Sequence, residues 1–163
     1  MLDELRSTSA PIAALVALQA FVVAFIALHD WVPLGPFNDV KAVQAADSRG
    51  RLVSVTLLST LPFAIGLAGT LVYGLARLPG WLTWCLRITY GAAAYGMVRA
   101  WWGPYLLYRD PLRAARYASM FGRTHAFLPE RNGIRPNTLH VALHLCVIAI
   151  IGILLDLQLR GAS

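Results

Sequence analysis

The sequence predicts an all-α polytopic membrane protein, with four transmembrane helices in an antiparallel bundle and short interfacial helices in the two long loops. The first observation is composition: of 163 residues, 58% are hydrophobic and only 13% are charged, and the mean hydropathy is +0.59. About a quarter of the residues of a typical soluble domain are charged. A chain of 17.8 kDa cannot bury this much apolar surface in water. Residues 1–163 therefore form a single domain with lipid as the main solvent.

The second observation is that four segments are apolar over the roughly 20 residues needed to cross about 30 Å of hydrocarbon. We predict spans over about 11–28, 52–76, 81–102 and 138–157. The first has Ser9 as its N-cap and Pro11 in its first turn, and the acidic residues Asp3 and Glu4 before it argue against a signal peptide. Only a few residues separate the second and third spans, so these two form an antiparallel hairpin.

The third observation is the distribution of the basic residues, which give a net charge of +6. An even number of spans places both termini on one side, together with the short hairpin turn. That side has Arg6, Arg77, Arg87 and Arg160. The side of the two long loops has Lys41, Arg49, Arg51, Arg99, Arg109, Arg113, Arg116, Arg123, Arg131 and Arg135. The positive-inside rule then places both long loops in the cytoplasm and both termini outside, as in a bacterial inner membrane. Basic loops also contact anionic lipid head groups, so we expect no nucleic acid partner.

Each long loop contains a short amphipathic helix. In residues 29–51, Asn38 is the expected cap of a helix whose Val40 and Val43 share a face, and Gly50 is expected to end it. In residues 103–137, Asp110 and Pro111 are the N-cap and first turn of a helix that ends at Gly122. We expect Arg113 and Arg116 on its wet side, with Leu112, Ala115 and Phe121 opposite.

Two histidines give the main chemical signal. His140 and His144 lie four residues apart at the start of the last span, which stacks them on one helix face, as in sites where two imidazoles bind one metal ion. A divalent metal would take further ligands from His29, Asp30 and His125. The residues between the pair include no Glu, which excludes the metalloprotease motif. In the alternative interpretation the imidazoles are structural hydrogen-bonding groups. Haem is not expected, because the second and third spans contain no histidine.

Arginines form the second candidate feature. Arg99, Arg131 and Arg135 are expected around the same cytoplasmic mouth, where paired guanidinium donors suit phosphate or carboxylate. Side chains that could complete the pocket wall are Trp102, Tyr105, Asn132 and Asn137. Tyr95, Arg99 and Trp102 recur at helical spacing and are expected to face the bundle. Membrane topology alone is the alternative explanation for these arginines.

Two hypotheses of function follow. In the first, a small membrane protein uses His140, His144 and His125 as acid/base groups or metal ligands, and uses arginines to bind an anionic or lipid-like small molecule. In the second, it is a non-enzymatic accessory subunit of a larger membrane complex. A homodimer fits either hypothesis. No carboxylate pair, activated nucleophile, phosphate-binding glycine loop or dinucleotide motif is present, so the sequence does not decide whether the protein is an enzyme.

Overall fold

The computed structural model describes residues 2–74 and 78–161, and within them it contains helices and turns but no strand. Four helices are long: α1 (Leu2–Leu28), α3 (Arg49–Tyr73), α4 (Gly80–Met97) and α7 (Thr138–Gly161). The short ones are the 3-10 helix η1 (Gly35–Phe37), α2 (Val40–Ala46), the π-helix η2 (Val98–Trp102), α5 (Gly103–Leu106) and α6 (Pro111–Phe121). The predicted all-α class is confirmed for this part of the chain.

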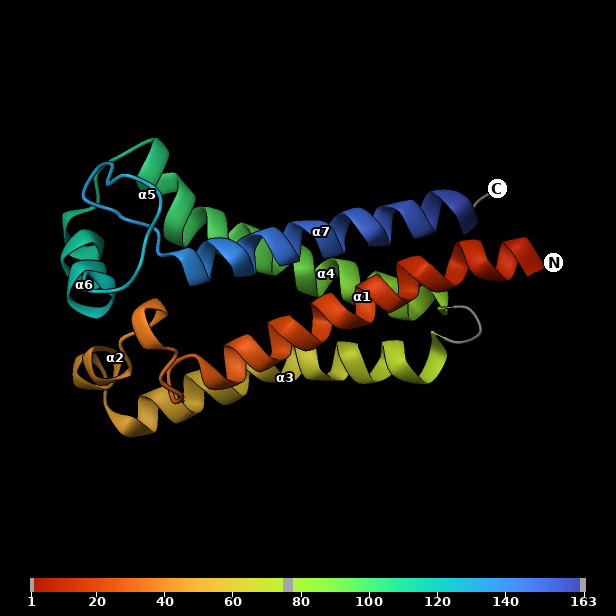
Figure 1. Ribbon diagram of the computed structural model, residues 1–163, viewed down its shortest axis with the longest axis horizontal. Coiled ribbons are helices and arrows are strands. Elements are labelled where there is room, and N and C mark those ends of the chain that lie inside the picture. Colours follow the sequence, from red (N-terminus) through yellow and green to blue (C-terminus); the bar gives the residue numbers. More distant parts are fainter. Residues whose placement is uncertain (1, 75–77, 162–163) are drawn as a thin grey trace.

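The four long helices lie lengthwise beside one another (Figure 1). Helix α1 packs against α3 and α7, and α4 packs against α7 and α3. All the short helices lie at one end of the molecule, and both ends of the chain lie at the other (Figure 1). The two long loops therefore share one end, which is the geometry that a common site between them requires.

Three helical segments of the described chain are long and apolar enough to cross a membrane. They are Ala10–Leu28 in α1, Arg49–Tyr73 in α3 and Thr138–Arg160 in α7. Most side chains along them are not buried inside the protein, as expected of helices that face lipid. Helix α4 is not among the three.

Several predicted helix ends differ from the observed ones. Helix α1 begins at Leu2, so Ser9 is not its N-cap and Pro11 lies inside the helix rather than in its first turn. The cap of α2 is Asp39 instead of Asn38, and its carboxylate accepts a hydrogen bond of 2.9 Å from the Ala42 N–H. Gly50 lies in the first turn of α3, because that helix begins at Arg49 and is capped by Ser48. The end of the predicted second span, residues 75–76, and Arg77 lie outside the described residues.

The core lies where the long helices meet. Its fully buried members include Leu15 and Val22 of α1, Leu86 and Tyr90 of α4, and Ile150 of α7. Gly66 of α3 allows close contact with α4, since a methyl group added there would lie 2.8 Å from a Leu86 methyl carbon. This packing fixes the helix ends that carry the candidate site.

A candidate site of histidines and aromatic rings at the loop end

A π-helical turn at the end of α4 positions the tryptophans of the site. In η2 the Gly103 N–H bonds to the Val98 carbonyl, five residues back, so this turn holds one residue more than an α-helical turn. The wide turn places Trp101 inward, with only 6% of its surface exposed. The Arg99 carbonyl loses its usual donor, because the Gly103 N–H bonds to Val98 instead. The Ala100 carbonyl has no α-helical donor either, since residue 104 is a proline and has no N–H. Side chains bond to both carbonyls.

Arg113 of α6 supplies those donors. Its Nη1 donates to the carbonyls of Arg99 and Ala100, both at 3.0 Å, and the Tyr117 hydroxyl donates to the Ala100 carbonyl at 3.2 Å. Arg113 Nε also pairs with Asp110 Oδ2 at 3.0 Å. Arg113 is thus half-buried against η2, and the prediction that it lies on the wet side of its helix is wrong.

Helix α6 has the predicted ends but a different packed face. Asp110 is its N-cap, with Oδ1 accepting from the Arg113 N–H at 3.1 Å, and Gly122 follows its last residue. Hydrogen bonds from the Arg113 backbone and side chain lower the pKa of the Asp110 carboxyl below 3.8. Leu112, predicted on the apolar side, is 87% exposed. Ala115 is exposed as well. Phe121 does pack against Trp101 as predicted, but its companions on that face are Ala114 and Tyr117.

The segment after α6 folds over the same aromatic rings. Arg131 and Ile134 exchange backbone hydrogen bonds of 3.0 and 2.9 Å across a two-residue turn. Asn132 and Gly133 form that turn with φ of 54° and 81°, values that favour Asn and Gly. The turn places Ile134, which is fully buried, against Trp101 and Tyr105.

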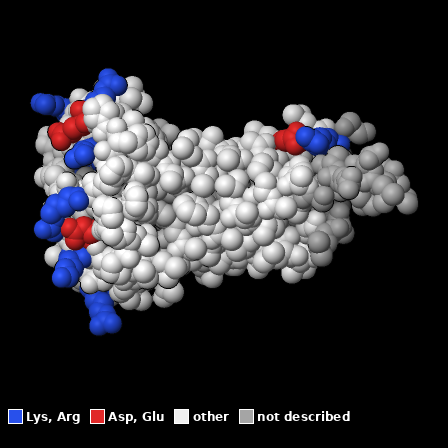
Figure 2. Space-filling view, in the orientation of Figure 1, with Lys and Arg blue, Asp and Glu red and all other residues white. Residues whose placement is uncertain are grey.

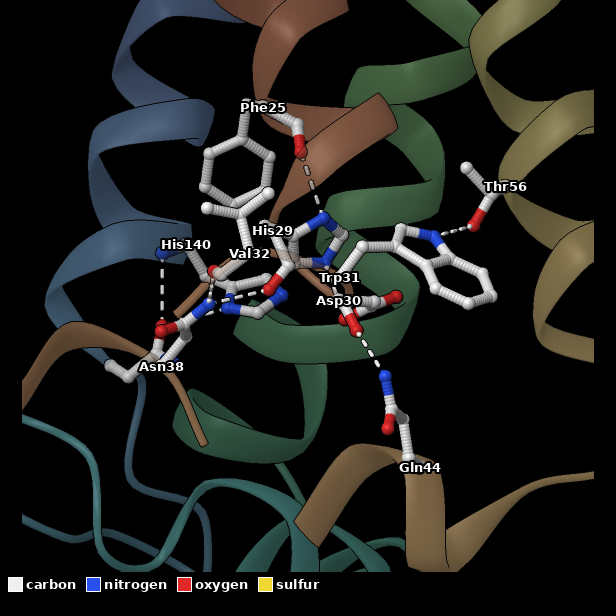
Figure 3. A network of polar contacts seen from close by, with 10 residues as sticks. Phe25, His29, Asp30, Trp31, Val32, Asn38, Gln44, Thr56 and His140 are labelled. Atoms are coloured by element: carbon white, nitrogen blue, oxygen red, sulfur yellow. Dashed lines mark hydrogen bonds and ion pairs between the residues drawn. The ribbon is translucent and has the colours of Figure 1, made fainter. Parts of the chain in front are cut away.

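Three imidazoles lie close together at this end of the molecule, and Figure 3 shows two of them, His29 and His140. The rings of His29, just after α1, and His140, in the first turn of α7, lie edge to face with centroids 5.7 Å apart. His144 lies one turn further along α7, 6.3 Å from His140. Aromatic rings surround them: Phe25 stacks on His29 at 4.5 Å, and Trp101 lies 4.5 Å from His140. We call His29, His140, His144 and these surrounding rings the histidine cluster.

The imidazole of His29 contacts the carboxylate of Asp30. His29 Nδ1 faces the Phe25 carbonyl oxygen at 2.9 Å and so must donate to it. Its Nε2 lies 3.1 Å from Asp30 Oδ1, and two lone pairs would repel there. Burial raises the pKa of the Asp30 carboxyl above 3.8, while the charge of His29 opposes this increase. The two side chains thus lie in contact just after the end of α1.

The two histidines of α7 are oriented by different partners. Asn137 Oδ1 accepts from the backbone N–H of His140 at 2.9 Å and from its ring Nδ1 at 2.7 Å. His140 therefore has an Nε2 lone pair when it is neutral. In contrast, His144 Nδ1 accepts from the indole N–H of Trp102 at 3.1 Å, so its Nε2 bears the hydrogen. The cluster thus presents one acceptor nitrogen and one donor nitrogen on adjacent rings.

The loop around His29 is held in place by two polar side chains (Figure 3). Asn38 donates to the carbonyls of His29 and Val32 at 2.6 and 2.8 Å. The Trp31 indole N–H donates to Thr56 Oγ1 of α3 at 3.0 Å. These bonds fix the end of α1 relative to α3.

The structure brings together some of the predicted site residues and separates others. His29, Asp30, Trp102, Asn137, His140 and His144 meet as described. His125 does not join them: it is exposed, with Nδ1 2.7 Å from Thr138 Oγ1 and its ring against Phe37. Tyr105 is buried beside Trp102, and Asn132 donates to its carbonyl at 3.2 Å.

The predicted arginine cluster is not assembled around His140. Arg99, Arg131 and Arg135 are all exposed. Arg131 lies over the Tyr105 ring at 5.7 Å, and Arg135 donates to the Ala126 carbonyl at 3.3 Å. Tyr95, predicted to face the other helices, is 65% exposed. The guanidinium groups remain in water, since their hydration is lost only where an anion replaces it.

Ion pairs hold the two long loops together above the histidine cluster. Arg116 of α6 pairs with Asp47, and Arg123 pairs with Asp39 at 2.8 Å. The His125 N–H also donates to the Pro36 carbonyl at 2.6 Å. Charged side chains gather at this end of the molecule, while the long middle section shows almost none on the face in view (Figure 2). We call α2, α5, α6 and residues 123–137 the cap.

No group of three or more His, Cys, Asp or Glu residues in the described chain is arranged to hold a metal ion. In the proposed metal set, His29 contacts Asp30, and the Nδ1 atoms of His140 and His144 are bonded to Asn137 and Trp102. The arrangement favours hydrogen-bonding and proton-transfer chemistry at the remaining nitrogens.

Sequence reasoning missed the residues whose rings contact the histidines, which are Phe25, Trp101 and Phe121. It also missed those that hold Trp101 in place: Arg113, Tyr117 and Ile134. Phe25 precedes His29 by four residues, so helical spacing could have placed it on the same face. Comparison with known proteins found no match: no family model fits this chain, and no curated protein and no solved structure is similar to it. A functional assignment therefore depends on the geometry of the histidine cluster.

Proposed function

We propose that this chain is a four-span protein of the bacterial inner membrane whose histidine cluster binds the polar group of an anionic, lipid-like small molecule. The observation that carries the proposal is the position of His140 between two other imidazoles, with the His29 ring at 5.7 Å and the His144 ring at 6.3 Å. Packing alone does not require three imidazoles in an aromatic core. A ring nitrogen buried there loses its hydration, and this is costly unless it gains a hydrogen-bond partner. A ligand with a hydroxyl, carbonyl or acid group would satisfy them.

The remaining nitrogens suit such a group. His140 Nε2 can accept a hydrogen bond, and His144 Nε2 can donate one, so the pair fits a group that offers both an acceptor and a proton. The rings of Phe25, Trp101 and Phe121 offer apolar contact to the rest of the ligand. Basic residues at the rim would attract an anion over distance without touching it. The same geometry would allow His140 to act as a base toward the bound group.

The position of α4 supports a fourth span. Helices α4 and η2 run without a break from Gly80 to Trp102, which at about 1.5 Å per residue is enough to cross about 30 Å of hydrocarbon. Their neighbours α3 and α7 are both long and apolar enough to span. Arg87 lowers the hydropathy of this segment, but it lies near one end, where an arginine can reach head groups. With four spans the basic cap faces the cytoplasm.

Native mass spectrometry of the full-length protein, released from detergent micelles, tests the binding proposal. The probe is a total lipid extract of the expressing bacterium. The wild type should retain an extract component that His140→Ala and His144→Ala lose by about tenfold, the equivalent of one hydrogen bond to a polar ligand. Arg49→Gln, an exposed change at the start of α3, is the matched control. Equal retention by all four proteins contradicts the proposal.

One observation favours the second hypothesis, an accessory subunit. Leu112 and Phe127 of the cap are 87% and 60% exposed, and Leu107, in the turn between α5 and α6, is 80% exposed. Apolar side chains in such positions either enter the lipid boundary or contact another protein. Substituting Leu107 and Leu112 with Ser distinguishes the two. If this variant loses a co-purifying protein while its histidine cluster remains intact, the accessory role is supported. If the composition of the purified sample does not change, the accessory role has no support.

A further inference from the structure

Arg87 lies inside the long-helix region, at the end opposite to the histidine cluster. It follows Gly80, the first residue of α4, by seven residues, and its contact on α7, Leu154, precedes the last residue Gly161 by seven. Both intervals correspond to about 10 Å along a helix axis. The guanidinium group therefore lies at the same depth on both helices, roughly two turns from their ends.

The charge of Arg87 is not neutralised by any described residue. Its Nη2 reaches the Leu154 carbonyl only at 3.5 Å, and its Nε is buried without a hydrogen-bond partner. The carboxylate of Asp156, two residues further along α7, is held by Arg160 at 2.8 Å. A guanidinium in an apolar setting without an anion is costly, so this arrangement indicates an anionic partner.

Aromatic side chains show where that partner would lie. The guanidinium carbon of Arg87 lies 5.7 Å from the centre of the Trp84 ring, one turn closer to the start of α4. Trp84 and Trp81 are 63% and 59% exposed on the outer surface of the helix. Tryptophan concentrates at the boundary between hydrocarbon and head groups. The Arg87 side chain is thus directed from the hydrocarbon toward the head groups of the nearer leaflet.

We propose that Arg87 and Trp84 form a binding site for the phosphate of a phospholipid, located where α4 meets α7. The forked guanidinium donors match phosphate oxygens, and the one hydrogen bond described for them is the long one from Nη2 to the Leu154 carbonyl. The exposed tryptophans would contact the glycerol and upper acyl region. This site is separate from the histidine cluster, so failure of one proposal leaves the other unchanged.

Native mass spectrometry of the delipidated full chain in detergent tests the site with three probes: phosphatidylglycerol, diacylglycerol and inorganic phosphate. The wild type should bind phosphatidylglycerol well above diacylglycerol, which lacks the phosphate. Arg87→Gln should weaken phosphatidylglycerol binding by about tenfold, as expected when a charge-assisted hydrogen bond is lost. Arg87→Lys should bind phosphatidylglycerol more weakly than the wild type and more tightly than Arg87→Gln, because lysine keeps the charge but lacks the forked donors. Arg49→Gln, at the opposite end of the molecule, should bind as the wild type does.

Equal phosphatidylglycerol binding by the wild type and Arg87→Gln would overturn the proposal. Displacement of the lipid by inorganic phosphate would also overturn it, because the site would then recognise free phosphate. If Arg87→Gln does not fold, the wild type still gives an answer. Phosphatidylglycerol with a photoreactive head group should crosslink to peptides covering residues 81–91 and 151–160. Crosslinks confined to the cap would exclude the site.

Discussion

Arg113 bonds to three groups that a regular helix would not present to it. The first is the Arg99 carbonyl, released by the π-helical turn, and the second is the Ala100 carbonyl, whose α-helical donor position is Pro104. The third is the carboxylate that caps its own helix. Its guanidinium therefore joins α6 to the end of α4. Because Trp101 lies in that turn, Arg113 acts on the histidine cluster without touching a histidine.

Replacing Arg113 with Met should lower the free energy of unfolding by about 2 kcal/mol, because it removes donors from two partly buried carbonyls and leaves the aliphatic stem. Chemical unfolding in detergent, followed by tryptophan fluorescence, measures the change. Arg109→Met is the control, since Arg109 is an exposed arginine of the same loop. If the two variants have the same free energy of unfolding, the hydrogen bonds from Arg113 to the Arg99 and Ala100 carbonyls do not stabilise the fold.

Asp110 makes the stability of the cap dependent on pH. Its folded-state pKa is lowered below the ordinary value of 3.8, so the unfolded chain binds protons more readily. Its stabilising contribution should be complete above pH 3.8 and should disappear as the pH falls through the lower folded-state value. Melting temperatures of the wild type and Asp110→Asn, compared from about pH 6 to about pH 2, should therefore converge at the acid end. A constant difference would show that Asp110 has no such role.

Some residues of the histidine cluster were predictable and others were not. The spacing of His140 and His144 placed both on one helix face, and the topology placed His29 and Asp30 at the same end. The arginines were grouped with them from loop position alone. That reasoning omits the preference of guanidinium groups for water, which leaves Arg99, Arg131 and Arg135 exposed in the structure.

Among the elements, the helices were more predictable than their ends. Hydropathy indicates where a helix is apolar, so it placed the start of the first span near Pro11. Helix α1 continues outward to Leu2, since a helix need not end where its apolar part ends. The residue types of the π-helical turn do not predict it, because Val98–Trp102 would fit a regular α-helix equally well. Only the packing of Trp101 and Arg113 distinguishes the π-helix from the α-helix.

The turn at residues 131–134 can be tested through Gly133. Its φ of 81° disfavours other residues, and a methyl group added there would lie 3.0 Å from the Ala114 methyl group of α6. Gly133→Ala should therefore lower the free energy of unfolding by about 1–2 kcal/mol. Gly50→Ala is the matched control, because Gly50 is helical with open space around it and should show no loss. Equal behaviour of the two variants would mean that the turn is not held against α6.

At the scale of the whole molecule, the common end of both long loops supports a single orientation in the membrane. In a variant without Cys85 and Cys146, cysteines introduced at Ser119 in the cap and at Gln158 near the end of α7 should label differently. Both positions are exposed. A membrane-impermeant thiol reagent should modify Gln158→Cys in intact cells and Ser119→Cys only after permeabilisation. The reverse pattern would place the cap outside, contrary to the positive-inside rule.

The π-helical turn restricts how this chain can change in length during evolution. Deleting one residue from Val98–Trp102 would restore regular α-helical geometry and rotate every later side chain by about 100° around the axis. Trp102 would then lose its bond to His144, and the carbonyls that Arg113 contacts would turn away from it. Relatives that retain the histidine cluster should consequently show no gap between Tyr90 and Tyr105 in an alignment, even where the residues themselves differ.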